Sequence, residues 1–343
     1  MKVARLMEPL RFELRDECEP VPGPGEALVE SLAVGICASD IHYYAEGGIG
    51  ENRLTEPLIP GHEPMGTVMA VGPNVAEEWI GKRVAVEPGV PCFKCEVCLR
   101  GDINLCPEVR FFGTPPIDGA FRERFVHPAV MLEEVPEDFS PTDGAMLEPL
   151  GVAIHAVDLA KPRTGTGAVV VGCGTIGLST IVMLRAAGVS PIYAMDPLPY
   201  RIEIAQKVGA DQVFLGLAAD VLEDYMAVTK RRGTEVVFEA AGQAAAHAPA
   251  MEMAAIGGKA VIIGITAADR VTYRESRARR KGLTIYMARR SRFTLRRGIQ
   301  LIQSNRIDLS ELVTHRFPLG RIQEAFEIAR HYRDGVVKAV IEP

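Results

Sequence analysis

The sequence lacks any apolar run that approaches the roughly 20 residues of a membrane-spanning helix. Its first residues, MKVARLMEPLRFEL, also lack the long apolar core of a secretory signal peptide. The chain also has no excess of positive charge. Its 38 Lys and Arg residues are outnumbered by 44 Asp and Glu residues, which gives a net charge of −6. We therefore expect a cytoplasmic protein that binds neither membranes nor nucleic acid.

Length and composition indicate a globular protein of about two domains. The chain has 343 residues, of which 48% are hydrophobic and 24% are charged, so it can bury large cores. It has seven cysteines, and four of them lie within residues 92–106. In a reducing compartment such crowding favours metal binding over disulfides.

Potential metal ligands and proton-transfer groups are concentrated between Gly35 and Glu63. A thiol, a hydroxyl, a carboxylate and an imidazole occur within 37–42, and His62 and Glu63 follow side by side. Catalytic zinc needs three protein ligands and an open position, and Cys37, His62 and either Glu63 or a later carboxylate would supply them. A lone cysteine is also commonly a small buried hydrophobe, so this cluster alone leaves both interpretations open.

A second carboxylate with two interpretations is Glu148. It stands among apolar residues where a helical pattern begins that runs to Leu159. A carboxylate inside an apolar face needs a partner, such as a metal or a group beside one. The alternative is a residue in the first helical turn that faces solvent and interacts with the helix dipole.

A separate four-cysteine motif predicts a structural metal site. The spacing is two, two and seven residues between successive cysteines, namely Cys92, Cys95, Cys98 and Cys106. Four thiolates with these short gaps can close a tetrahedron around one zinc ion and leave no open position. An iron–sulfur cluster is the alternative, but no electron-transfer pattern lies nearby. Zinc is therefore the predicted metal.

The amino-terminal part of the chain predicts a strand-rich domain. Short apolar or alternating runs are broken by Pro and Gly clusters, as expected for strands joined by turns. The predicted strands cover residues 3–6, 12–14, 27–34, 65–71 and 82–87. Cys37 and His62 then fall where strands end and loops begin, a common place for chemistry.

From about Gly151 the sequence alternates apolar strands with amphipathic helices, which predicts a doubly wound parallel sheet. The chain closes with a predicted helix near 320–331 and a strand at 336–341, which we expect to return to the first domain. We expect one domain from 1–150 and 290–343, with a lobe at 88–107, and a nucleotide-binding domain from 151–289. The strands predicted in the second domain cover 168–171, 191–196, 212–215, 235–239 and 259–264, and the helices cover 175–187, 218–230 and 244–256.

A glycine-rich turn in this second domain predicts a nucleotide site. Gly172, Gly174 and Gly177 form a GxGxxG pattern that follows a buried strand and opens a helix with Thr175 and Ile176. Glycines let the backbone approach a pyrophosphate at the helix amino terminus. That structural context makes the motif more specific than the pattern alone.

The acid expected to bind the cofactor ribose is Asp196, which lies nineteen residues after the last glycine of the motif. Its carboxylate would accept hydrogen bonds from the ribose hydroxyls and repel a 2′-phosphate, so NAD is preferred over NADP. Arg201 could soften this preference, stack on the adenine, or lie on a helix surface. We include it among the cofactor-binding residues.

In combination, these features resemble the zinc-dependent medium-chain dehydrogenases, and within them the sorbitol and xylitol (polyol) dehydrogenase branch. The resemblance spans essentially the whole chain and implies a GroES-like catalytic domain with a Rossmann domain. Its most specific stretches are GICASDIHYY (35–44), PGHEPMGTV (60–68), EPGVPCFKCEVCLRGDINLCP (87–107), FFGTPPIDG (111–119), EPLGVAIHA (148–156), VGCGTIG (171–177) and LVTHRFPL (312–319).

The resemblance also implies roles for individual residues. Cys37, His62 and Glu63 would bind a catalytic zinc, and Glu148 would bind it directly, through water, or by turns with Glu63. Asp40 would orient the His62 imidazole. Ser39 and His42 match a proton relay from substrate to solvent, and the four cysteines from Cys92 to Cys106 match the structural zinc lobe.

Substrate contacts are implied for Tyr43, Phe112, Thr114 and Arg290, with Glu148 also near the substrate. The residue after the arginine is usually Tyr in the animal enzymes and is Ser291 here. The implied activity is reversible oxidation of a secondary alcohol of a polyol to a ketose, with two zinc ions and NAD, by a homotetramer. Alternatives are an L-threonine or sugar-phosphate dehydrogenase that uses the arginines at 289–297, or a non-catalytic nicotinamide-binding protein.

Overall fold

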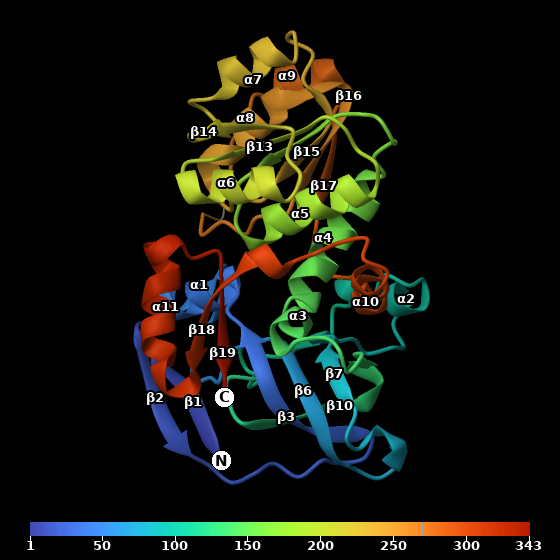
Figure 1. The fold of residues 1–343 in the computed structure, drawn as a ribbon, viewed down its shortest axis with the longest axis vertical. Helices are drawn as coiled ribbons and strands as arrows, with labels where there is room; N and C mark the ends of the chain where they lie inside the picture. The colour runs from blue at the N-terminus through green and yellow to red at the C-terminus, as the bar shows by residue number, and fades with distance from the viewer. Residues whose placement is uncertain (269) are drawn as a thin grey trace. The chain divides into compact units, whose positions relative to one another are not determined.

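The computed structural model describes residues 1–268 and 270–343, which divide into two compact units (Figure 1). The first unit comprises Met1–Glu148, Leu295–Ile299 and Val313–Pro343. The second comprises Pro149–Thr294 and Gln300–Leu312. The boundaries fall within the helices α4 (Leu147–Ala160) and α10 (Leu295–Gln303).

The first unit is built on a seven-stranded sheet. Its order is β11-β7-β6-β3-β19-β18, and β10 also pairs with β3. All pairs are antiparallel except β18 with β19. The strands are β3 (Glu26–Gly35), β6 (Glu63–Val71), β7 (Arg83–Val86), β10 (Arg124–Pro128), β11 (Leu132–Glu134), β18 (Val313–Pro318) and β19 (Lys338–Glu342).

The strand register brings the ends of three strands together. Gly35, the last residue of β3, pairs with Glu63, the first residue of β6. Gly35 also pairs with Val340 of β19, so residues from both ends of the chain meet at this point of the sheet. β3 is almost entirely buried, as its apolar sequence predicts.

Smaller elements complete the first unit. Three two-stranded sheets are formed by β1 (Lys2–Glu8) with β2 (Arg11–Asp16), β4 (Gly48–Ile49) with β5 (Asn52–Arg53), and β8 (Gly89–Val90) with β9 (Arg110–Phe111). The helices are α1 (Ala38–Glu46), α2 (Glu96–Leu99), α3 (Pro141–Ala145) and α11 (Ile322–Arg330). The α11 ring of Phe326 packs 4.8 Å from Phe12 and 5.1 Å from Tyr44, measured between centroids.

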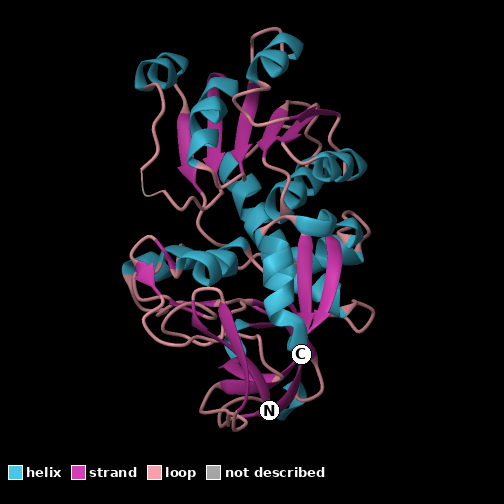
Figure 2. Cartoon of the chain, turned by 90° about the vertical axis from the view of Figure 1, so that its left-hand side faces the viewer, coloured by secondary structure: helices cyan, strands magenta, loops and turns pink. Residues whose placement is uncertain are grey.

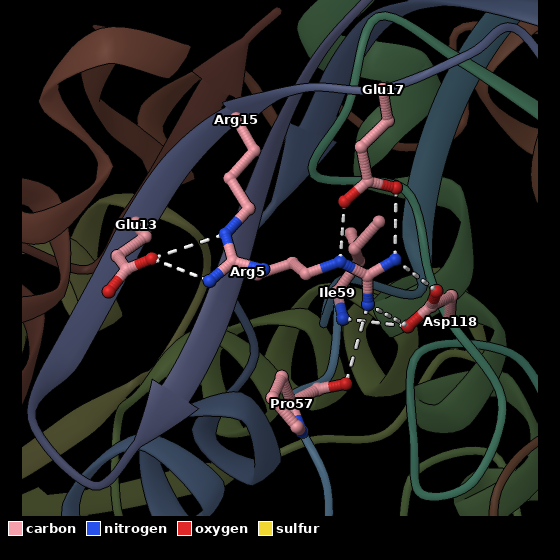
Figure 3. Close-up of polar contacts among 7 residues, drawn as sticks. All are labelled: Arg5, Glu13, Arg15, Glu17, Pro57, Ile59 and Asp118. Carbon is pink, nitrogen blue, oxygen red and sulfur yellow. Dashed lines mark hydrogen bonds and ion pairs between the residues drawn. The ribbon is translucent and has the colours of Figure 1, made fainter.

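A polar network ties the β1–β2 hairpin to the segment that leads to His62 (Figure 3). Arg5 binds both carboxylate oxygens of Glu17, at 2.6 and 3.0 Å, and lies 3.1 Å from Asp118. Asp118 in turn accepts a hydrogen bond from the backbone N–H of Ile59 at 2.9 Å. This chain of contacts fixes the backbone just before the predicted metal ligands.

The second unit contains a six-stranded sheet in the order β14-β13-β12-β15-β16-β17. Every neighbouring pair is parallel. Its strands are β12 (Ala168–Val171), β13 (Ile192–Asp196), β14 (Gln212–Leu215), β15 (Thr234–Glu239), β16 (Ala254–Ile262) and β17 (Thr284–Met287).

Helices cover both faces of this sheet, as Figures 1 and 2 show. On one face α5 (Thr175–Ala186) contacts α6 (Pro199–Lys207). On the other α8 (Ala244–Met253) contacts α7 (Leu222–Val228) and α9 (Glu275–Lys281). The predicted doubly wound α/β class is confirmed. Among the helices of residues 1–268 and 270–343, none combines the length and apolar character that a bilayer crossing requires.

Most predicted strands occur within a few residues of their expected positions, but some elements differ. The strand predicted at 259–264 begins earlier, at Ala254, because a register shift extends its pairing with β15. Helix α1 was not predicted. It begins with a capping box in which Cys37 N–H donates to the Asp40 carboxylate, and cysteine is not a usual residue at that cap. Strand β18 and helix α9 were also missed.

Candidate metal and nucleotide sites

Three potential metal ligands converge at the strand ends of the first unit. Cys37 stands at the amino-terminal cap of α1, His62 directly precedes β6, and Glu63 begins that strand. One ligand atom from each lies within 4.8 Å of the other two. His62 and Glu63 are buried and Cys37 is partly exposed. A thiolate, an imidazole and a carboxylate in this arrangement fit a zinc ion with an open position.

The Asp40 carboxylate contacts both backbone segments that carry these potential ligands. One of its carboxylate oxygens accepts from Cys37 N–H at 3.0 Å. The other accepts from Gly61 N–H at 3.3 Å and lies 3.4 Å from His62 Nδ1. Because Asp40 faces Nδ1, the other ring nitrogen of His62 is the one available to a metal.

The same neighbours control protonation of the imidazole. Burial opposes the charge on His62, but the nearby Asp40 and Cys37 side chains outweigh it through charge and hydrogen bonding, and raise the pKa of His62 well above 6.5. Only neutral imidazole is a metal ligand, so a metal ion at this site must displace a proton.

Glu148 lies in the first turn of α4 and is 6% exposed, so the solvent-facing alternative is wrong. Burial, together with the charges of Glu63 and Glu87, raises the pKa of Glu148 to about 8. Its carboxyl group therefore holds a proton at neutral pH in the protein without metal. The group of three converging ligands does not include it.

A buried lysine, Lys338, contacts Glu63. The sequence did not predict this contact. Lys338 Nζ donates to Glu63 Oε2 and, at 3.0 Å, to the carbonyl of Ile36. The signal in the sequence was a single charged residue inside the apolar run at 336–341.

The predicted relay residues both lie on α1. Ser39 is buried, whereas His42 is partly exposed and its Nδ1 lies 3.1 Å from Glu46 Oε2. A carboxylate partner for His42 was not predicted, although its position four residues later on the helix is a usual spacing for such a pair.

Two of the predicted substrate residues, Tyr43 and Phe112, belong to the buried core of the first unit. Tyr43 is buried and accepts from Asn52 Nδ2 at 2.8 Å. Phe112 packs in the core, with its ring 5.1 Å from that of Phe125. Its neighbour Phe111 is the residue against the site, with its ring 5.3 Å from His62.

Thr114 and Arg290 complete the predicted substrate set. Thr114 Oγ1 donates to the carbonyl of Phe111 at 3.0 Å, which holds the turn behind that ring. Arg290 belongs to the second unit, is partly buried and has a left-handed backbone with φ of 57°.

The four cysteines of the lobe form a second metal group. Their sulfur atoms lie within 4.8 Å of one another. Backbone N–H groups point at sulfur, from Cys95 to Cys92 and from Cys98 to Cys95, both at 3.4 Å. Hydrogen bonds from the backbone of Lys94 and Cys95 lower the pKa of Cys92 to about 7. Such donors favour thiolates, so the lobe fits a closed zinc site.

The glycine-rich turn of the second unit fits a nucleotide. A Cβ at Gly172, whose φ is 92°, would lie 2.6 Å from Ala241, and one at Gly177 would overlap the carbonyl of Gly172. A Cβ at Gly174 would meet only Arg201, at 3.8 Å. The outer glycines are therefore required by packing, while the middle one keeps backbone accessible at the start of α5, where Thr175 and Ile176 lie.

Asp196 ends β13 beside this turn. One of its oxygens accepts from Cys173 N–H at 2.8 Å and the other from Leu198 N–H at 2.9 Å. Arg201, near the start of α6, lies 3.6 Å from the same carboxylate. Each carboxylate oxygen has a second lone pair, so the residue can also accept from a ligand hydroxyl.

Both units of the chain resemble known protein families. The family model described as alcohol dehydrogenase GroES-like domain matches residues 23–137, and that described as zinc-binding dehydrogenase matches 175–304. The sorbitol dehydrogenase of Bacillus subtilis (strain 168) is 36% identical over 333 residues, which cover 96% of this chain and 94% of that protein. The L-arabinitol 4-dehydrogenase of Hypocrea jecorina is 36% identical over 325 residues, which cover 93% and 85% respectively.

Solved structures show the same fold. A protein of Escherichia coli CFT073, described as a short chain alcohol dehydrogenase complexed with NADH, superposes with a TM-score of 0.93 and 25% sequence identity. The superposition covers 100% of this chain and 99% of that chain.

Proposed function

Because the chain belongs to the zinc-dependent medium-chain dehydrogenases, in their polyol branch, we propose that it oxidises a secondary hydroxyl of a polyol to a ketone with NAD. The reaction is reversible hydride transfer, and its product is a ketose. The observation that carries the proposal is the convergence of Cys37, His62 and Glu63 within 4.8 Å.

These three side chains would hold the catalytic zinc, with Glu148 as a further carboxylate close to the site. When bound, zinc supplies Lewis-acid polarisation of the substrate hydroxyl. Asp40 orients the imidazole through its contact with Nδ1. The four-cysteine lobe would hold a second, structural zinc that takes no part in the chemistry.

Proton removal is assigned to α1. Ser39 would accept the hydroxyl proton of the substrate as it gives up its own, and His42 would deliver one proton to solvent. His42 suits this role because its imidazole is partly exposed and can exchange a proton with solvent. Glu46, 3.1 Å away, stabilises the protonated ring.

The turn at Gly174 and the Asp196 carboxylate support NAD as the cofactor. The exposed backbone would bind the pyrophosphate, and Asp196 would accept from the ribose hydroxyls. The NADH in the Escherichia coli CFT073 structure supports the same assignment. Arg201 reduces the net negative charge beside the ribose, so some turnover with NADP is expected.

The polyol assignment is supported by the names of the sorbitol and L-arabinitol dehydrogenases, which match over most of their length. Phe111, beside His62, offers an apolar wall to the substrate carbon chain. The similarity to this branch also predicts a homotetramer, which light scattering after size-exclusion chromatography would measure.

The test is NADH formation by the purified protein with sorbitol, xylitol, other polyols, L-threonine and sugar phosphates. We expect turnover of a neutral polyol, with a KM that changes little with ionic strength. The protein could instead prefer a phosphorylated substrate, with a KM that rises steeply with salt. That result would contradict the proposal and would indicate that the arginines at 289–297 bind an anionic substrate.

A further inference from the structure

Lys338 is a fully buried lysine whose ammonium group contacts a predicted metal ligand. Its side chain is 1% exposed, as is that of Glu63, and the two form an ion pair. Lysine is rarely buried to this extent, and a buried ammonium group requires a partner. One oxygen of Glu63 is therefore already engaged by a cation that belongs to the protein.

The backbone dictates this contact. Lys338 is the first residue of β19, and Gly35 pairs with Val340 of that strand and with Glu63 of β6. A Cβ at Gly35 would lie 2.7 Å from Lys338 Cε and would overlap Glu63 Oε2. Glycine at this position leaves the space that the ion pair occupies.

We propose that Lys338 is a positioning residue that makes Glu63 a one-oxygen ligand of the catalytic metal. It retains Oε2, so only Oε1 remains for the metal, and the fourth position stays open for substrate. Without Lys338, Glu63 can bind through both oxygens and fill that position. The inference rests on the assignment of Glu63 to the metal in the proposed function.

Lys338 also balances charge at the site. Its Nζ pairs with Glu63, whose ligand atom converges with those of Cys37 and His62. A thiolate and a carboxylate buried together gain from a fixed cation, and its removal leaves Glu63 buried without that partner. A bound metal ion is then the nearest cation to which the second carboxylate oxygen can turn.

The experiment uses the complete protein with cobalt(II) in place of the catalytic zinc. Four-coordinate cobalt(II) absorbs visible light several-fold more strongly than five-coordinate cobalt(II). The variants are Lys338→Met, Lys338→Arg and Gly35→Ala, which keeps the lysine but separates the pair. The Cys37→Ala protein, which keeps only the lobe metal, provides the spectrum to subtract.

We expect Lys338→Met to keep its metal, to lose most of the Cys37-dependent visible absorbance, and to lose kcat/KM by about 10- to 100-fold. Gly35→Ala should change in the same direction, and Lys338→Arg should restore much of the absorbance. The matched control is Lys281→Met in the second unit. Lys281 donates to the carbonyls of Met251, Glu252 and Ala254, so this variant should lose stability with an unchanged spectrum.

The outcomes separate this inference from the proposed function. An unchanged cobalt spectrum in Lys338→Met and Gly35→Ala overturns the positioning role alone. Loss of the metal from both variants overturns it too, because Lys338 would then act only in holding the site together. Absence of any Cys37-dependent spectrum in the unmodified protein would overturn the metal assignment itself.

Discussion

Asp40 Oδ1 lies 3.4 Å from Nδ1 of His62, and both side chains are buried. The Asp40 carboxylate also holds Cys37 N–H and Gly61 N–H. One side chain therefore orients the imidazole and joins the two backbone segments that carry the metal ligands.

Replacing Asp40 by Asn should weaken metal binding without removing a ligand. The amide has a similar shape but no charge, and its nitrogen cannot accept the hydrogen bonds that the carboxylate accepts. We expect about a 10- to 100-fold loss of affinity for the catalytic zinc, measured by competition with a chelator. Retention of the parental affinity would show that the Asp40 contact has no role in orienting His62.

Replacing Cys98 by Ser should remove the structural zinc. Cys98 is buried and its sulfur lies 3.5 Å from that of Cys95. Because a structural zinc site contributes folding energy directly, we expect one zinc fewer per chain and a lower thermal unfolding midpoint. Zinc content and calorimetry measure both. Unchanged zinc content in this variant would contradict the four-cysteine assignment.

Replacing Asp196 by Ala should weaken NAD binding more than NADP binding. A hydrogen bond to a charged group is worth about 1.5–3 kcal/mol, so KM for NAD should rise about 10- to 100-fold. KM for NADP should change less, because the carboxylate no longer repels a 2′-phosphate. Fluorescence titration of NADH measures the same effect without turnover. Equal losses for both cofactors would indicate that the change only disrupts the glycine-rich turn.

His127 should make the protein sensitive to acid. Its ring is buried against Phe112 and its Nε2 lies 3.1 Å from the carbonyl of Glu87. Burial, with a smaller contribution from Arg110, lowers the pKa of His127 from 6.5 to about 4. Between these values the unfolded chain binds the proton and the folded protein does not, so stability falls as pH falls through this window. The total loss is about 3 kcal/mol.

The comparison that isolates this effect is His127→Gln, which keeps a donor but cannot become charged. Its unfolding midpoint should fall less than that of the parent between about pH 7 and about pH 4. Loss of zinc in acid affects both proteins equally, so the difference reports His127. His331→Gln, at a more exposed position, is the control. Parallel acid profiles for His127→Gln and the parent would refute the assignment.

The metal ligands were accessible to sequence reasoning because they are local signals. The four cysteines lie within fifteen residues, and Cys37, His62 and Glu63 stand in short motifs at strand ends. The glycine-rich turn was accessible for the same reason, since its three glycines lie within six residues.

The contacts that the sequence did not reveal depend on register and long-range pairing. Lys338 reaches Glu63 only because β19 pairs with β3 and β3 with β6, across 275 residues of sequence. Phe111 rather than Phe112 faces His62 because adjacent residues of an extended segment point to opposite sides. Residue types alone cannot show which of two adjacent side chains points toward the site.

The most direct test of the account is NADH formation from a polyol by the protein as purified, after chelation, and after zinc is restored, with Cys37→Ala measured in parallel. We predict turnover that disappears on chelation and returns with zinc, and no turnover by Cys37→Ala although it still binds NADH. Polyol oxidation that persists in Cys37→Ala, or that is indifferent to zinc, would contradict the assignment of this site.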